Sequence, residues 1–322
     1  MEQKRILALG FFDGVHLGHG ALLTACRALA DEKGVQAGAV TFTSHPDALV
    51  SGKAPGLINT PADRERIMRE EYKMDAVIAL PFDRAMMTMP WQDFFCLLRE
   101  KYHAAGLVCG HDFRFGNRGE GNAAILRSVC AENGMDCIVI PQQKLDGVTI
   151  SSTHIRMLLE QGEMEEAARF LGHPHFLTGE VVGGRHLGHK LGFPTANIDL
   201  SGRFLPKAGV YAVRAVLPCN GVENCGGSEP PAGDSEKIIA PCGAYFGIAN
   251  LGAAPTVGHP KVLLEVHFDG FSGDLYGKTV TVEFLSFLRE IQKFASKADL
   301  SLQLEKDLTR LRATAADFPL KK

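Results

Sequence analysis

The stretch Ile6-Leu-Ala-Leu-Gly-Phe-Phe-Asp-Gly-Val-His-Leu-Gly-His19 decides the fold of the first half of the chain. It begins with a short apolar run, passes through glycines and an aspartate, and leads into a helical pattern over residues 18–31. A strand, a glycine turn and a helix in this order open an α/β unit. We therefore expect the chain to begin with a parallel sheet.

The same alternation continues through the first half. Apolar runs that predict buried strands cover residues 6–9, 37–42, 76–80, 106–109 and 137–140, and helical patterns cover 61–72, 90–102, 122–133 and 163–171. Apolar strands joined by helices form a parallel sheet covered on both faces. Ligands bind such sheets beyond the carboxyl ends of the strands, where the loops carry His16, His19, His45 and Asp112.

His16 and His19 are three residues apart where the first strand leads into a helix. Side chains with this spacing face the same way, and the free N–H groups of the helix start point to the same place. Two imidazoles there could hold phosphate oxygens, although two surface histidines at a helix cap would look the same. A second phosphate element, Ile150-Ser-Ser-Thr-His-Ile-Arg156, places three hydroxyl residues before a helical run over 155–161. Simple N-capping explains one of these hydroxyls, and a phosphate site explains all three with the arginine.

The pattern changes after residues 172–174, which we interpret as a hinge. Short strands are predicted at 176–182, 209–216, 244–251, 262–268 and 279–285, with turns but no helices between them. Such spacing favours an antiparallel β-barrel, and the leucines of 298–313 predict an amphipathic helix that covers it. We therefore expect two domains, 1–172 and 173–322. Residues 217–241 are rich in Gly, Pro, Asn and Ser, and we interpret them as a long hairpin connection without an assigned role.

Three pieces of the barrel carry candidate chemistry. Pro194-Thr-Ala-Asn197 places a hydroxyl and an amide oxygen on one side of an extended chain, where they could complete the shell of a Mg²⁺ ion bound with ATP. Residues 250–256 form a second polar corner. Glu265 lies in an apolar strand, where a carboxylate is costly unless it has a partner or a function, although it could also face outwards.

The net charge, the composition and the cysteine content of the chain exclude several classes of protein. A net charge of −3 and an apolar content of 45% over 322 residues predict a globular protein with no general attraction to nucleic acid or membranes. The first apolar run is too short for a signal peptide, so we expect the protein in the cytoplasm. The eight cysteines are expected to be reduced thiols. Cys219, Cys225 and Cys242 could bind a metal, but their spacing matches no common ligand pattern.

The motifs of the first half resemble the adenylyltransferase module of prokaryotic bifunctional riboflavin kinase/FAD synthetases. They are FDGVHLGH (12–19), GHDFRFG (110–116) and ISSTHIR (150–156). The resemblance implies catalytic His16 and His19 in a phosphate site that also holds Phe12, Asp13, Gly14, Gly18, Ser152, Thr153 and Arg156. It places His45, Asp112 and Phe113 beside the flavin or nucleotide. Thr149 and Ser44 stand where the family often has a basic residue and a proline.

The second half resembles the riboflavin kinase module of the same family through LGFPTANI, GVYAV, NLGxxPT, LEVH and DLYG, in this order. The resemblance implies that Glu265 is the general base and that Thr195 and Asn197 ligate Mg²⁺ and ATP. It also implies that residues 183–190 form a flap over the phosphates, with Gly184, His189 and Asn250 at the ATP and flavin site. His189 replaces a usual arginine and is only partly charged near neutral pH.

The resemblance as a whole implies an enzyme that phosphorylates riboflavin to FMN with MgATP and then adenylylates FMN to FAD. Riboflavin, FMN and FAD would be substrates and products rather than cofactors. Two alternatives stay open. The chain could retain only one activity, the adenylyltransferase having been weakened through Thr149 and Ser44, or it could bind flavins without catalysis. The sequence leaves the oligomeric state and any direct transfer of FMN between the sites undecided.

Overall fold

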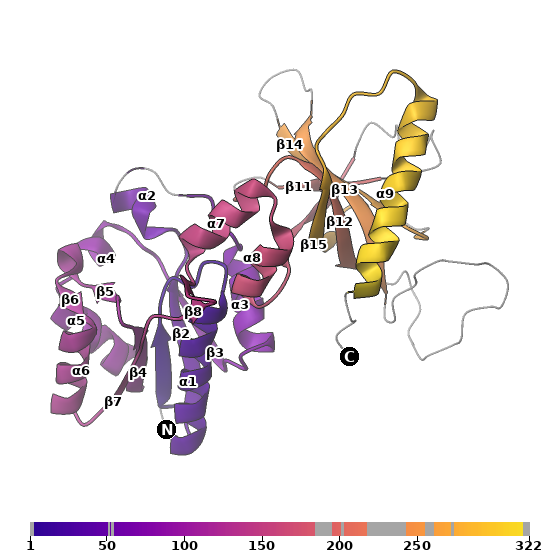
Figure 1. Cartoon of the computed structure of the whole chain (residues 1–322). Coiled ribbons are helices and arrows are strands. Elements are labelled where there is room, and N and C mark those ends of the chain that lie inside the picture. Colours follow the sequence, from indigo (N-terminus) through magenta and orange to yellow (C-terminus); the bar gives the residue numbers. More distant parts are fainter. Residues whose placement is uncertain are drawn as a thin grey trace. The chain divides into compact units, whose positions relative to one another are not determined.

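The computed structural model describes residues 3–50, 52, 55–183, 195–200, 203–217, 243–254, 261–271 and 274–317. The chain forms two compact units (Figure 1). The first contains Met1–Arg156 with Phe170–Gly172, and the second contains Met157–Arg169 with His173–Lys322. Across the described ranges, no helix combines the length and the apolar character that a membrane span requires.

The first unit is built on a five-stranded parallel sheet, as the apolar runs predict. Its strand order is β3-β2-β1-β4-β7. The strands are β1 (Arg5–Leu9), β2 (Gln36–Phe42), β3 (Ala76–Leu80), β4 (Ala104–Gly110) and β7 (Asp136–Ile140). Strand β1 lies at the centre of the sheet. Strands β2 and β3 are added on one side of it, and β4 and β7 are then added on the other side. The loops that follow β1, β2 and β4 therefore open at one edge of the sheet.

Helices cover both faces of this sheet (Figure 1). The helices of the first unit are α1 (Leu17–Lys33), α2 (Pro46–Val50), α3 (Pro61–Glu70), α4 (Arg84–Thr88), α5 (Trp91–Cys96) and α6 (Ala123–Glu132). Helix α7 (Ser152–Gln161) begins in this unit, whereas its residues after Arg156 and most of α8 (Met164–Leu171) belong to the second unit. Leu7, Leu107 and Cys109 of the sheet share one core with Phe94 of α5 and Leu126 of α6. On the other face, the Cys26 thiol of α1 donates to the backbone oxygens of Ile6 and Gly38, at 3.3 and 3.5 Å.

Two helical segments differ from the sequence prediction. The single helix expected over residues 90–102 is instead α5 followed by a π-helical turn, η1 (Leu97–Lys101), in which the Tyr102 N–H bonds to the Leu97 oxygen at 3.3 Å. Helix α7 begins three residues earlier than predicted, because the Ser151 hydroxyl accepts from the His154 N–H at 3.2 Å and caps it. Short hairpins pair β5 (Arg114–Phe115) with β6 (Gly121–Asn122), and β8 (Lys144–Leu145) with β9 (Val148–Thr149). Between β5 and β6 lies the 3₁₀ turn η2 (Asn117–Gly119).

The second unit contains the predicted antiparallel barrel. It closes in the order β10-β11-β14-β13-β12-β15, and β15 pairs back onto β10. The strands are β10 (His175–Val182), β11 (Ala196–Asp199), β12 (Gly209–Val216), β13 (Ala244–Ala254), β14 (Lys261–Phe268) and β15 (Thr279–Arg289). Strand β13 continues through residues 250–254, which the sequence suggested as a corner, because its pairing with β14 continues to Ala254. The expected corner residue Thr256 and the connection over 218–242 lie outside the described residues.

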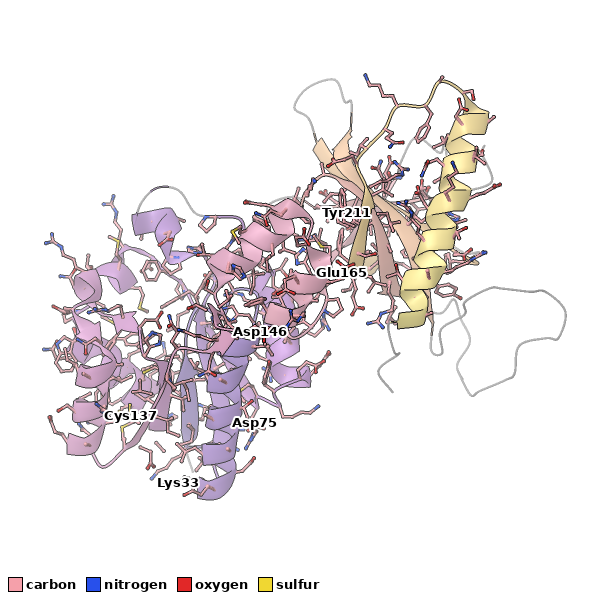
Figure 2. The ribbon with its side chains drawn as sticks, in the orientation of Figure 1. Lys33, Asp75, Cys137, Asp146, Glu165 and Tyr211 are labelled. Atoms are coloured by element: carbon pink, nitrogen blue, oxygen red, sulfur yellow. The ribbon has the colours of Figure 1, made fainter. Side chains whose placement is uncertain are left out.

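The two faces of the barrel strands pack against different partners. Tyr211, labelled in Figure 2, is fully buried. Its ring meets the fully buried Phe284 ring edge to face, with the ring centroids 5.0 Å apart. Phe246 and Ile248, on the alternate positions of β13, instead pack with Leu311 of the final helix, α9 (Lys297–Asp317). Alternation along the strands therefore divides an inner core from an outer face that α9 covers.

Candidate active sites

The first candidate site surrounds the loop between β1 and α1, whose backbone is held in an uncommon conformation. Phe12 and Val15 have φ values of 58° and 39°, in the left-handed region that side chains disfavour. The Phe11 oxygen at the start of the loop accepts hydrogen bonds from the Thr41 hydroxyl, at 2.8 Å, and from the Arg64 guanidinium. Backbone strain of this kind persists where neighbouring groups fix it, as they do here, and it is concentrated at functional sites.

His16 and His19 lie together at the start of α1, as their spacing predicts. Their rings stack with centroids 3.6 Å apart. His16 is the N-cap residue, and its Nδ1 accepts the His19 N–H at 3.2 Å. The neutral His16 ring therefore carries its proton on Nε2. Gly18 makes this geometry possible, because a Cβ there would approach the His16 ring to 3.1 Å.

His19 is held in its neutral form. Burial lowers the pKa of His19 well below its usual value, and the neighbouring His16 and Arg64 lower it further. Its Nδ1 is buried and has no hydrogen-bond partner among the described residues. The first helical turn thus presents two imidazoles beside backbone N–H groups and the positive end of the helix dipole. This arrangement can bind an anion and donate hydrogen bonds to it.

Asp13 connects the loop to the second predicted phosphate element. Its carboxylate accepts the Ile58 and Asn59 N–H groups at 3.0 and 3.4 Å and pairs with the Arg156 guanidinium. The Ser152 hydroxyl donates to the Asp13 backbone oxygen at 2.9 Å. Burial raises the pKa of the Asp13 carboxyl, although Arg156 opposes that shift. The structure therefore brings the start of α7 to the β1–α1 loop across more than 130 positions of sequence.

The other residues predicted for this site occupy the same edge of the sheet with different exposure. His45, after β2, meets the Phe11 ring edge to face at 4.7 Å, and burial lowers its pKa. Phe113, after β4, stacks on Phe115 with ring centroids 5.5 Å apart. The Asp112 side chain is 82% exposed, and Thr153 is exposed on the first turn of α7.

Two buried polar residues of this site were missed by the sequence reasoning. Arg64 is 1% exposed, donates to the Phe42 oxygen at 2.9 Å and lies 4.5 Å above the Phe11 ring. Asn59 is 2% exposed, and neither polar atom of its side chain has a hydrogen-bond partner among the described residues. A helix-start arginine and a turn asparagine carry no distinguishing sequence signal, so only the fold reveals them.

The second candidate site is a row of polar residues across three adjacent barrel strands. Asn197 of β11 lies directly opposite Glu265 of β14, and Glu265 lies directly opposite Asn250 of β13. Directly opposed residues point to the same face, with Cβ atoms about 5 Å apart. Asn197 is buried and Glu265 is half-buried, and the flanking Leu264 and Val266 are fully buried on the opposite face.

This row faces the outer side of the barrel. Asn250 is two positions from Ile248, which packs with α9, so the two side chains share a face. The Asn250 Oδ1 is buried without a hydrogen-bond partner among the described residues. Thr195 is half-buried and lies directly before β11, two residues before Asn197. The predicted residues Gly184 and His189 lie outside the described residues.

The chemistry of the two sites differs. The first offers imidazoles and a helix start, which suit phosphate groups. The second offers one carboxylate between two amides, which suits proton abstraction from a hydroxyl beside a cation. In the described part of the chain, no group of three or more His, Cys, Asp or Glu side chains could hold a metal ion. A cation in the second site would therefore need further ligands from a substrate or water.

Comparisons with known proteins match each unit to a separate enzyme. A family model described as FAD synthetase matches residues 1–154, and one described as riboflavin kinase matches residues 171–315. A protein of Haemophilus influenzae named bifunctional riboflavin kinase/FMN adenylyltransferase is 36% identical over 95% of this chain and 93% of its own length. The protein of that name from Escherichia coli K12 is 33% identical over 98% of this chain and 93% of its own.

Comparison with solved structures gives a likeness over nearly the whole chain. The matching structure is described as a macrolide-efflux protein from Streptococcus pneumoniae and superposes with a TM-score of 0.81 at 28% sequence identity. The match covers 97% of this chain and 95% of that one. The likeness therefore extends over both units.

Proposed function

This chain belongs to the family of bifunctional riboflavin kinase/FMN adenylyltransferases, and on that premise we propose which of its residues serve each reaction. The chain phosphorylates riboflavin to FMN with ATP. It also transfers AMP from ATP to FMN, which gives FAD and releases pyrophosphate. Residues 1–172 would form the adenylyltransferase domain and residues 173–322 the kinase domain, a division supported by the ranges of the two family models.

Glu265 would be the general base of the kinase. Its place between Asn197 and Asn250, on one face of three paired strands, is the observation that carries this assignment. The carboxylate would take the proton of the terminal ribityl hydroxyl as that oxygen attacks the γ-phosphorus of ATP. The two flanking amides would orient the hydroxyl and the phosphate, since each can donate and accept hydrogen bonds.

The same row fits a Mg²⁺ ion that arrives with ATP. Asn197 and Thr195 would supply neutral oxygen ligands, and phosphate oxygens and water would supply the rest. The Asn250 Oδ1 of this row is buried without a hydrogen-bond partner among the described residues, which supports a polar ligand there. When bound, the ion would neutralise charge on the phosphates. Gly184 and His189 complete the proposed nucleotide site from the predicted flap.

His16 and His19 would be the catalytic groups of the adenylyltransferase. Their stacked rings at the start of α1 support a site for the ATP phosphates. His16 would donate from Nε2 to a phosphate oxygen as FMN attacks the α-phosphorus, which stabilises the charge that develops there. No covalent intermediate is required, because positioning and electrostatics account for phosphoryl chemistry of this type.

The remaining residues would position the two substrates. Phe12, Gly14 and Gly18 would shape the phosphate loop, and Asp13 would hold Arg156 against it through their ion pair. Thr153 and Ser152 would approach the far phosphates from the start of α7. His45, Asp112 and Phe113, at the carboxyl ends of β2 and β4, would lie on the flavin side.

A time course of the purified protein with riboflavin, ATP and Mg²⁺ tests this function. Chromatography should show FMN appearing first and FAD following, with one pyrophosphate released for each FAD. FMN without FAD would mean that the adenylyltransferase has been lost. Neither product would mean that the chain only binds flavins. A parallel incubation with ADP in place of ATP is the control and should yield neither product.

A further inference from the structure

Three cysteines form a cluster in the first unit that neither flavin reaction uses. They are Cys109 of β4, Cys130 of α6 and Cys137 of β7, and we call them the thiol cluster. Leu107 lies opposite Cys137, and Cys109 lies opposite Val139, so Cys109 and Cys137 share one face of the sheet. Helix α6 covers this face, and its Cys130 belongs to the same core as Cys109, with Cys137 packed against it. All three are free thiols.

Only one of the three thiols reaches the surface. Cys109 and Cys130 are fully buried, whereas Cys137 is half-buried on β7, the edge strand of the sheet (Figure 2). Hydrogen bonds from the Cys109 and Cys130 thiols lower the pKa of the Cys137 thiol. The same contacts with Cys137 raise the pKa values of Cys109 and Cys130. Cys137 is the thiol of the cluster that an oxidant can reach from the edge of the sheet, and its two neighbours favour its thiolate form, which is the form that attacks oxidants.

Chain geometry selects Cys130 as the partner of Cys137. After Cys130 the chain reverses at once, because its backbone oxygen accepts the N–H groups of Asn133 and Met135 at 3.0 and 2.9 Å. Gly134, with φ of 64°, allows this turn, and Cys137 follows two residues after Met135. A bond between the two sulfurs would close a loop of only a few residues. The end of α6 can adjust to disulfide geometry, since the last turns of helices are readily deformed.

Cys109 is less suited to a bond with Cys137. It lies two positions along β4 from Leu107, the residue opposite Cys137. Strands about 4.8 Å apart and a rise of about 3.3 Å per residue separate such Cα atoms by roughly 8 Å. A disulfide requires Cα atoms within about 7 Å, and the sheet cannot shift without breaking its hydrogen bonds. The role left to Cys109 is to donate its hydrogen bond to the Cys137 sulfur.

We infer that Cys130 and Cys137 form a peroxide-sensitive dithiol that closes to a disulfide between the end of α6 and β7. The Cys137 sulfur attacks hydrogen peroxide, so that an S–O bond forms, the O–O bond breaks and one water leaves. The Cys130 sulfur then attacks the sulfenic acid, so that the S–S bond forms, the S–O bond breaks and a second water leaves. Two thiols lose two electrons and two protons, and the peroxide is reduced to two waters.

Peptide mapping of the full-length protein tests this inference. The protein is treated with hydrogen peroxide, alkylated under denaturing conditions and digested with trypsin. Cys130 and Cys137 fall in one peptide, residues 128–144, whereas Cys109 falls in another, residues 102–114. The 128–144 peptide should escape alkylation at both cysteines and weigh two hydrogens less than its reduced form. Dithiothreitol should restore both alkylation sites.

Variants separate the steps. In Cys130→Ser, Cys137 should accumulate a sulfenic acid that dimedone traps, because its resolving thiol is absent. Cys96→Ser removes a half-buried thiol of α5 outside the cluster and should leave the disulfide yield unchanged. Full alkylation of the wild-type 128–144 peptide after peroxide would overturn the inference. A cross-link between the two peptides, or sulfinic acid on Cys137 without a disulfide, would overturn it as well.

Discussion

At the residue scale, His175 shows how a single buried imidazole makes the barrel sensitive to acid. The side chain is 1% exposed, and neither ring nitrogen has a hydrogen-bond partner among the described residues. Burial lowers the pKa of His175 to about 3. The folded barrel therefore keeps the ring neutral under conditions in which the unfolded chain, with a pKa of about 6.5, takes up a proton.

This difference sets the direction of the pH dependence. Below about pH 6.5 the unfolded state binds the proton and the folded state does not, so the free energy of unfolding falls as the pH falls towards 3. Between pH 8 and pH 5 the loss should be about 2 kcal/mol. Urea unfolding of the wild type and of His175→Phe, followed by circular dichroism at both pH values, measures it. Equal losses in the two proteins would contradict this account.

Arg64 shows how a buried cation can position a catalytic loop without touching a substrate. It donates to the Phe11 oxygen, the Phe42 oxygen and the Thr41 hydroxyl, and so fixes the chain that leads into His16. Arg64→Met should lower FMN adenylylation by about 10²-fold, since small displacements at a reacting centre have effects of this size. Riboflavin phosphorylation in the other unit should be unchanged.

A matched control for this change lies on the same helix. Arg66 is two residues further along α3, and its exposed side chain pairs with Glu70 at 3.3 Å. Arg66→Met should keep both activities, because exposed pairs of this kind contribute less than about 1 kcal/mol. Rates of FAD formation from FMN would be compared for the two variants. An equal loss of FAD formation in both variants would contradict the account, because it would show that the contacts of Arg64 with the loop do not cause the loss.

At the element scale, helix α9 contacts the barrel through its apolar face and through a buried ion pair between Asp307 and Arg289. Asp307 is fully buried, and its carboxylate accepts from the Arg289 guanidinium of β15 at 2.8 to 3.1 Å. Gln303 donates to the same carboxylate at 2.9 Å. Strand and helix are therefore joined near the end of β15, beside the face on which Leu311 packs.

Removal of the carboxylate should loosen α9. Asp307→Ala leaves the Arg289 cation without its partner and should lower the free energy of unfolding of the barrel by about 3–5 kcal/mol. Glu305→Ala changes an exposed residue of the same helix and should cost less than about 0.5 kcal/mol. Hydrogen exchange of α9 peptides would report the difference. Unchanged protection in Asp307→Ala would show that the apolar face alone holds the helix.

The sequence predicts the helices and strands better than it predicts which residues meet in a site. Strand β12 matches its prediction at both ends, because turns bound a continuous apolar run. The row of Asn197, Glu265 and Asn250 could not be assembled from sequence, since it depends on the order in which distant strands pair. The thiol cluster was missed because it joins residues of β4, α6 and β7, which only the fold brings together. Arg64 was missed because an arginine near a helix start carries no distinguishing sequence signal. The π-helical turn over 97–101 was missed because its residues carry an ordinary helical pattern.

At the scale of the whole molecule, the chain carries out two reactions that use ATP and contains two different folds, a parallel sheet and a closed barrel. The parallel sheet offers a helix start and imidazoles at the carboxyl ends of its strands. The barrel offers a carboxylate in a paired row of amides. Apolar runs joined by helical patterns predicted the parallel sheet, and the spacing of short strands predicted the barrel. Since each unit has its own core, loss of one site should leave the other reaction intact.

Two variants assayed with two substrates test this claim most directly. Glu265→Ala should lower FMN formation from riboflavin by about 10²–10⁴-fold and still convert supplied FMN to FAD at the wild-type rate. His19→Ala should form FMN from riboflavin normally and lower FAD formation from FMN by about 10²–10³-fold. Loss of both reactions in either folded variant would contradict the account of two separate sites.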